Sequence, residues 1–92
     1  MARILIADDE EAIRDLVKEV LSAEKHEFLL AENGAQALEL LRSKGADLAI
    51  IDRNMPGLSG IDVVKVIRST PALDKVKILM CTAASVTAEI DE

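Results

Sequence analysis

Four short apolar runs alternate with amphipathic segments along this 92-residue chain, and this alternation restricts the fold more than any other feature. The runs have the length and β-branched content of buried strands. They lie at residues 3–7, 27–31, 47–51 and 76–81. Between the first two runs, Ile13, Leu16 and Val20 recur at helical spacing. Strands that alternate with helices pair in parallel through right-handed crossovers, so the sequence predicts an α/β domain with an open parallel sheet.

Turn and capping residues bound the predicted helices. Asn33-Gly34 marks the start of the second helix, and Gly45 ends it. The run Ser59-Gly60-Ile61-Asp62 matches a capping box at the start of the third helix. From Ser85 the pattern predicts the beginning of another helix, which reaches scarcely two turns before Glu92.

Composition excludes several classes of protein. The formal net charge of −6 argues against binding to nucleic acid or to an anionic membrane through this segment. The lone Cys81 excludes an intramolecular disulfide and suits a reducing, cytoplasmic setting, with the thiol expected to be a packing residue. No apolar run is long enough to span a membrane, and the first residues do not form a signal peptide. We expect one soluble, cytoplasmic domain over residues 1–92.

Polar residues follow three of the four predicted strands. They are Asp8 and Asp9, Asp52, and Thr82. Ligands of open parallel sheets bind beyond the carboxyl ends of the strands, where these side chains should meet. Carboxylates brought together repel unless a cation lies among them, and Mg²⁺ prefers such oxygen ligands. A metal-assisted phosphoryl site is one interpretation; the other is that the acids only favour the N-termini of helices.

Four segments together resemble the receiver domain of two-component response regulators of the chemotaxis-regulator type. They are Ile4 through Glu10, Ala31-Glu32-Asn33-Gly34, Asp52 through Gly60, and Met80-Cys81-Thr82-Ala83. The stretch D-x-x-M-P-x-x-x-G with an upstream Asp-Asp is the most specific part of this resemblance. It implies a flavodoxin-like, doubly wound parallel sheet with strand order 2-1-3-4 here, the fifth strand and fifth helix being absent.

The resemblance also implies a role for each polar residue. Asp52 resembles the phosphoacceptor, Asp9 the direct Mg²⁺ ligand and Asp8 an outer ligand that acts through water. Asn54 would offer its backbone carbonyl to the metal, and Thr82 resembles the switch hydroxyl. The implied metal set is therefore Asp8, Asp9, Asp52 and Asn54. The implied partner is a histidine kinase or phosphotransfer protein, and the domain is a phosphoacceptor that assists its own turnover rather than an enzyme.

The sequence departs from the family pattern at its C-terminal end. No Lys matches the one that pairs with the phosphoryl group in the family. The fourth strand is expected to be an exposed sheet edge, so the domain is expected to be a truncation, a fragment, or a protein that completes its sheet by self-association. We expect impaired phosphorylation and signalling with metal binding retained.

Two other functions are weighed against the signalling switch. One is a receiver-like interaction module that is not phosphorylated, which the missing Lys favours. The other is a hydrolase of the aspartyl-phosphate type. Such hydrolases generally need a second Asp two residues after the nucleophile, and Asn54 stands there in this chain.

Overall fold

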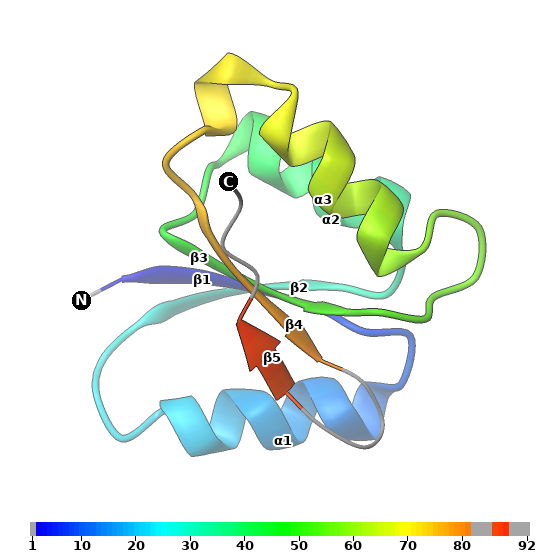
Figure 1. The fold of residues 1–92 in the computed structure, drawn as a ribbon. Helices are drawn as coiled ribbons and strands as arrows, with labels where there is room; N and C mark the ends of the chain where they lie inside the picture. Colours follow the sequence, from blue (N-terminus) through cyan, green and yellow to red (C-terminus); the bar gives the residue numbers. More distant parts are fainter. Residues whose placement is uncertain (1, 82–85, 89–92) are drawn as a thin grey trace.

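A five-stranded sheet with the order β2-β1-β3-β4-β5 forms the centre of the computed structural model (Figure 1). The structure describes residues 2–81 and the backbone of residues 86–88. The strands are β1 (Arg3–Ala7), β2 (Glu27–Ala31), β3 (Leu48–Asp52), β4 (Lys77–Cys81) and β5 (Val86–Ala88). The helices are α1 (Glu11–Leu21), α2 (Gly34–Ser43) and α3 (Gly60–Arg68), with a 3-10 turn η1 (Pro71–Leu73) before β4. Strands β1 to β4 are all parallel, which confirms the predicted order 2-1-3-4.

The strand β5 is not expected from the sequence pattern. It runs antiparallel to β4, with Leu79 opposite Ala88 and Cys81 opposite Val86. The expectation of a helix is therefore wrong for residues 86–88, and the edge of β4 is paired from Leu79 to Cys81 rather than exposed. Val86 and Thr87 are β-branched, and the free edge of β4 offers them hydrogen bonds, whereas a helix of two turns is unstable by itself. β5 is short and antiparallel, so it is not the parallel fifth strand of the family.

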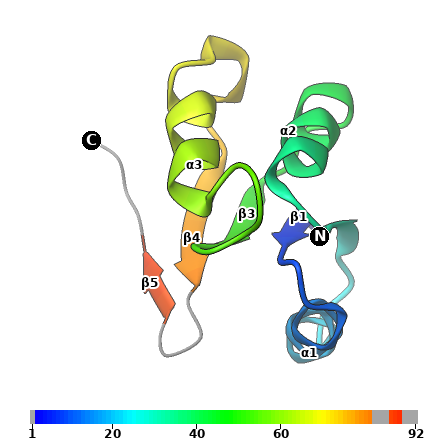
Figure 2. The ribbon, with the colours of Figure 1, turned by 90° about the vertical axis from the view of Figure 1, so that its right-hand side faces the viewer.

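The helices lie in two layers, one on each side of the sheet. Figure 2 shows α1 below the sheet edge and α2 with α3 on the opposite side. The larger core lies under α2 and α3, where Leu5, Ile51 and Val63 are fully buried. Alternate residues of the same strands, such as Ile4 and Ile6, form a smaller cluster on the α1 side. This alternation is the ordinary consequence of a two-residue side-chain period in strands.

Local hydrogen bonds fix where α2 and α3 begin, as the sequence predicts. The Asn33 side chain accepts a hydrogen bond from the backbone N–H of Gln36 at 2.8 Å. At α3, Ser59 Oγ accepts from the Asp62 amide at 3.2 Å, and Asp62 Oδ2 accepts from the Ser59 amide at 3.3 Å. The predicted capping box is therefore confirmed.

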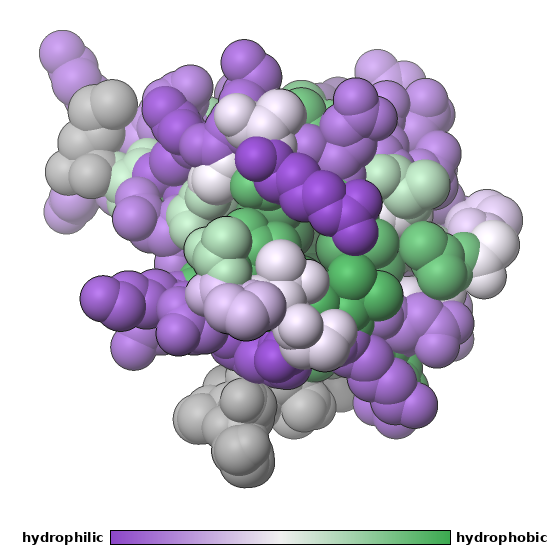
Figure 3. Space-filling view, turned by 90° about the horizontal axis from the view of Figure 1, so that it is seen from above, coloured by the Kyte–Doolittle hydropathy of each residue, from purple (hydrophilic) through white to green (hydrophobic). Residues whose placement is uncertain are grey.

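The outer surfaces of the two helical layers are mixed in polarity. Figure 3, which looks onto the α2 and α3 layer, shows apolar side chains at its centre bordered by hydrophilic ones. Leu58 and Ile61, just before and within the first turn of α3, are each 37% exposed. On α1, Leu16 and Val20 are more than half exposed. Among the described residues, no helix has the length and apolar character needed to cross a membrane.

Candidate functional site

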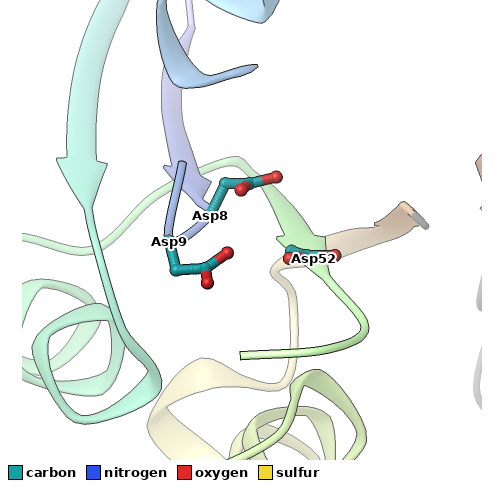
Figure 4. A group of neighbouring side chains, drawn as sticks. All are labelled: Asp8, Asp9 and Asp52. Atoms are coloured by element: carbon teal, nitrogen blue, oxygen red, sulfur yellow. The ribbon is translucent and has the colours of Figure 1, made fainter. Parts of the chain in front are cut away.

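Three carboxylates converge at the carboxyl edge of the sheet. Asp8 and Asp9 directly follow β1, and Asp52 is the last residue of β3. Because β1 and β3 are neighbours with Ala7 paired to Ile51, the residues that follow lie side by side. One carboxylate oxygen from each of the three residues can be chosen so that all lie within 4.8 Å of one another. Figure 4 shows Asp8 and Asp9 extending from the end of β1 toward Asp52.

The cluster lines a pocket of about 370 Å³. Its lining residues are Asp8, Asp9, Glu10, Ile13, Asp52, Asn54 and Cys81. Asn54, the predicted backbone ligand, is therefore at the pocket. Its backbone N–H donates a hydrogen bond to Asp52 Oδ1 at 3.4 Å. Thr82, the predicted switch hydroxyl, lies outside the described residues. The structure thus brings together Asp8, Asp9, Asp52 and Asn54.

Three hydrogen bonds hold Asp8 in the turn between β1 and α1. Its amide donates to the Ala31 carbonyl at 3.0 Å, which continues the β1–β2 ladder by one residue. Its Oδ1 accepts from the Glu10 amide at 2.9 Å. Its backbone carbonyl accepts from Nη1 of Arg14 at 2.6 Å. Asp8 is buried, whereas Asp9 is exposed and Asp52 half-buried, so the three acids differ in their access to solvent.

The loop after Asp52 is shaped by a close backbone approach. The Gly60 amide donates to the Arg53 carbonyl at 2.9 Å, and a Cβ atom on Gly60 would lie only 2.2 Å from the Asp52 carbonyl oxygen. The Arg53 amide donates to the Cys81 carbonyl at 2.7 Å, which ties the loop to β4. Gly57 has a φ of 77°, a conformation that favours glycine. The last glycine of the 52–60 motif is therefore required by packing against the backbone of Asp52.

The electrostatics of the pocket disfavour the ionised acids. Burial is the main cause that raises the pKa of Asp52, and the charges of Asp8, Asp9 and Glu10 raise it further, while the hydrogen bond from the Asn54 amide opposes them. Burial likewise raises the pKa of Asp8, against the opposing hydrogen bond from Glu10. Accumulated negative charge without a counter-ion is the arrangement that a bound cation would relieve.

Comparison with known proteins identifies the family. The family model of the response regulator receiver domain matches residues 4–92. The chain belongs to the response regulator receiver family. It is 37% identical over 87 residues to the response regulator MprA of Mycolicibacterium vanbaalenii, covering 95% of this chain and 37% of MprA. The receiver chain thus spans less than two fifths of the length of that relative.

Solved structures agree with this assignment. The response regulator TrrA of Thermotoga maritima, in a structure with Mg²⁺ and BeF, superposes with a TM-score of 0.83 at 46% identity, covering 90% of this chain and 70% of TrrA. TrrA in a complex with the histidine kinase ThkA gives a TM-score of 0.82 at 46% identity, over 92% and 72% of the two chains. Receiver domains are signalling switches of two-component phosphorelay systems rather than ordinary enzymes.

The acid cluster of this receiver domain fits a hard divalent cation. Asp8, Asp9 and Asp52 supply carboxylate oxygens from two adjacent strands, and the pocket is open to the water that Mg²⁺ retains in protein sites. Burial raises the pKa values of Asp8 and Asp52, and neighbouring acids raise them further, so a bound cation would favour the ionised carboxylates. The donor set therefore suits a magnesium ion.

Two pocket residues of this receiver domain are not among the site residues predicted from the sequence. Glu10 lines the pocket, and its charge raises the pKa of Asp52. Cys81 was expected only to pack, but it is half-buried, lines the pocket and stands opposite Asp52 in the β3–β4 register. Burial is the main cause that raises the pKa of its thiol. The signal that could have placed Cys81 at the pocket is its position in the sequence. It ends the strand that pairs with β3, and β3 ends in Asp52.

Proposed function

We propose that Asp52 accepts a phosphoryl group from a phosphohistidine of a histidine kinase or phosphotransfer protein, with Mg²⁺ held by Asp8, Asp9, Asp52 and the Asn54 carbonyl. The observation that carries this proposal is the convergence of three carboxylates within 4.8 Å at the carboxyl edge of a receiver fold. Carboxylates can act as nucleophiles toward phosphoryl groups, giving an aspartyl phosphate.

Asp52 is better placed than its neighbours to be the nucleophile. Asp8 is buried, and its Oδ1 already accepts a hydrogen bond at 2.9 Å. The hydrogen bond to Asp52 Oδ1 is longer, at 3.4 Å, and the side chain is half-buried at the pocket. An oxygen of Asp52 is therefore free to approach phosphorus, while Asp8 is fixed in the turn.

The transfer exchanges one bond to phosphorus for another. A carboxylate oxygen of Asp52 forms the new O–P bond as the N–P bond to the donor imidazole breaks. The electron pair of that bond leaves with the imidazole. A bound Mg²⁺ would offset the charge on the phosphoryl oxygens in the transition state. Asp8 and Asp9 would hold the ion and orient the pocket, and the Thr82 hydroxyl would bond the phosphoryl group afterwards as the switch.

Two structures of one relative, TrrA, support the choice of ligand and partner. TrrA, 46% identical, has been solved with Mg²⁺ and BeF, and TrrA has also been solved with the kinase ThkA. An Mg²⁺ site and a kinase partner are proposed for this chain by that likeness and by its own donor set.

Intact mass tests the proposal directly. The chain is incubated with phosphoramidate or acetyl phosphate and Mg²⁺, and we expect the mass of one phosphoryl group to be added. Asp52→Asn should gain nothing, whereas Asp15→Asn, an exposed acid on α1, should behave as the unaltered chain. If the unaltered chain gains no mass, the phosphoacceptor function is wrong and the non-phosphorylated interaction module is the better account.

Isothermal titration with Mg²⁺ tests the ligand assignment separately. Binding should be detectable for the unaltered chain and much weaker for Asp9→Ala, because one direct oxygen ligand is lost. Equal binding by both proteins would remove Asp9 from the metal set.

The interaction module predicts self-association at the edge of β4. In the structure β5 pairs with Leu79 to Cys81, so a second copy would have to displace β5 or add to it. Light scattering at high protein concentration distinguishes the cases. A monodisperse monomer would exclude completion of the sheet by association.

A further inference from the structure

Arg14 is a basic residue beside the most acidic part of the molecule. It lies in the first turns of α1, is half-buried, and its Nη1 donates to the backbone carbonyl of Asp8 at 2.6 Å. The next residue toward the N-terminus, Ile13, lines the acidic pocket, whereas Arg14 does not. The guanidinium therefore contacts the site from outside the pocket, through the backbone carbonyl of Asp8.

The carbonyl that Arg14 binds lies where the sheet ladder ends. The Asp8 amide is still bonded to Ala31 of β2 at 3.0 Å. Arg14 supplies the donor for the Asp8 carbonyl from α1, one residue beyond the end of β1.

The same turn lacks an ordinary helix cap. Glu10, the N-cap residue of α1, makes no side-chain capping hydrogen bond. The amide of Glu10 itself donates a hydrogen bond to the carboxylate of Asp8. The side chain of Asp8 therefore binds forward to Glu10 and its carbonyl binds to Arg14, and these two bonds join the end of β1 to the start of α1.

The charge of Arg14 also acts on the acids. Burial is the main cause of the raised pKa of Asp8, and the Arg14 guanidinium opposes it, lowering that pKa. Charge alone, however, would make Arg14 unfavourable for a metal ion at the same place, because like charges repel. If Arg14 acts only through its charge, its replacement by a neutral residue should strengthen metal binding. If Arg14 acts by holding the turn, the same replacement should weaken metal binding.

We propose that Arg14 is the positioning residue of this site: by binding the Asp8 carbonyl, it holds the β1–α1 turn so that Asp8 and Asp9 face Asp52 before any metal binds. The expected effect on Mg²⁺ binding rests on the proposed function, but the hydrogen bond from Arg14 restrains the turn without metal. Residues that orient metal ligands from outside typically change metal affinity by about 10–100-fold when they are replaced.

The experiment compares Arg14→Gln, Arg14→Lys and the matched control Arg42→Gln. Arg42 is exposed in the last turn of α2, so its replacement removes the same charge away from the site. Amide hydrogen exchange at Glu10, measured without metal, is the first readout. We expect faster exchange in Arg14→Gln, an intermediate rate in Arg14→Lys, and no change in Arg42→Gln.

Mg²⁺ affinity by titration is the second readout. Arg14→Gln should bind about tenfold more weakly, with partial recovery in Arg14→Lys, which keeps one donor and the charge. Tighter binding by Arg14→Gln would show that Arg14 acts only as a repelling charge, and unchanged binding would show that its hydrogen bond is incidental; either overturns the inference. If Arg14→Gln shows no thermal unfolding transition, it is not folded. The Mg²⁺ affinity of Arg14→Lys, compared with that of the unaltered chain, then tests the inference.

The two readouts separate this inference from the proposed function. If the unaltered chain does not bind Mg²⁺, the proposed metal site is wrong, while exchange at Glu10 still tests Arg14. If Mg²⁺ binds and the Glu10 amide is unaffected by both Arg14 substitutions, the positioning role is wrong and the proposed function stands.

Discussion

The Cα of Gly60 faces the backbone of Asp52 so closely that a Cβ atom there would lie 2.2 Å from the Asp52 carbonyl oxygen. The start of α3 is thus packed directly on the main chain of the proposed phosphoacceptor. The Arg53 Cα, in the same peptide unit, would lie 2.9 Å from that Cβ. Because both neighbours are backbone atoms, no side chain can turn away to make room.

We therefore expect Gly60→Ala to destabilise the domain by about 1–3 kcal/mol, the usual range for overpacking a buried site. The helix propensity of alanine, better by about 1 kcal/mol in a helix interior, offsets little of this because Gly60 is the first residue of α3. The thermal midpoint should fall by roughly 4–8 °C for each kcal/mol in a domain of this size. Lys65→Ala, at an exposed position of α3, is the control. Equal midpoints for the two variants would contradict the packing argument.

Stability without divalent cations should fall as pH rises through the acid range. Burial and neighbouring acids raise the pKa values of Asp8 and Asp52 above the ordinary value of 3.8 for this side chain. Above pH 3.8 and below these raised values the folded state holds more protons than the unfolded chain, so raising the pH favours unfolding. The loss is complete above the folded pKa values and persists at neutral pH. Thermal midpoints measured from pH 4 to 7.5 in the presence of a chelator test this.

For the same reason Asp52→Asn should raise the thermal midpoint at pH 7 without metal. The Asn side chain keeps an oxygen that can accept a hydrogen bond from the backbone N–H of Asn54. The substitution also removes one of the repelling charges. Asp15→Asn, exposed on α1, removes a charge outside the cluster and serves as the control. A lower midpoint for Asp52→Asn than for the control would show that the Asp52 carboxylate stabilises the metal-free fold.

Added Mg²⁺ should raise the midpoint of the unaltered chain at pH 7, because a ligand that binds only the folded state stabilises it. The gain is about 2.7 kcal/mol when free Mg²⁺ is 100 times its dissociation constant. Asp9→Ala should gain much less at the same concentration. The same gain in both would mean that Mg²⁺ acts elsewhere, for example by screening the net charge of −6.

The capping box of α3 should contribute about 1 kcal/mol, since Ser→Ala at an N-cap typically costs 0.5–2 kcal/mol. Ser59→Ala removes the acceptor that binds the Asp62 amide at 3.2 Å. Ser59→Asp keeps an acceptor and should retain most of the stability. Denaturant unfolding measures both, and equal losses in the two variants would show that the cap contributes little.

Much of this site follows from the order of residues along the chain. Asp8, Asp9 and Asp52 come where apolar runs stop, and alternation of strands with helices puts strand ends at one edge. The capping box at Ser59 needs only contacts within one turn. The strand order itself came from the family resemblance, because periodicity does not state which strands are neighbours.

Other parts of the site depend on contacts between distant segments. Cys81 enters the pocket because β4 pairs with β3 in a register that sets it opposite Asp52. The helix expected after Ser85 fails over residues 86–88, where pairing with β4 prevails over a local pattern that also suits a short helix. Glu10 acts on Asp52 through space, and its position in the sequence suggests only an acid at a helix start.

By itself, the sequence determined the alternation of strands and helices, the places where acids leave the strands, and the start of α3, since these depend on side-chain periodicity and on hydrogen bonds within a few residues. Only the tertiary structure decided that Gly60 must lack a side chain against Asp52, that Arg14 holds the Asp8 carbonyl, and that β5 pairs with β4. The physical reason is that close approach, hydrogen bonding across a turn and strand register depend on how whole elements pack in space.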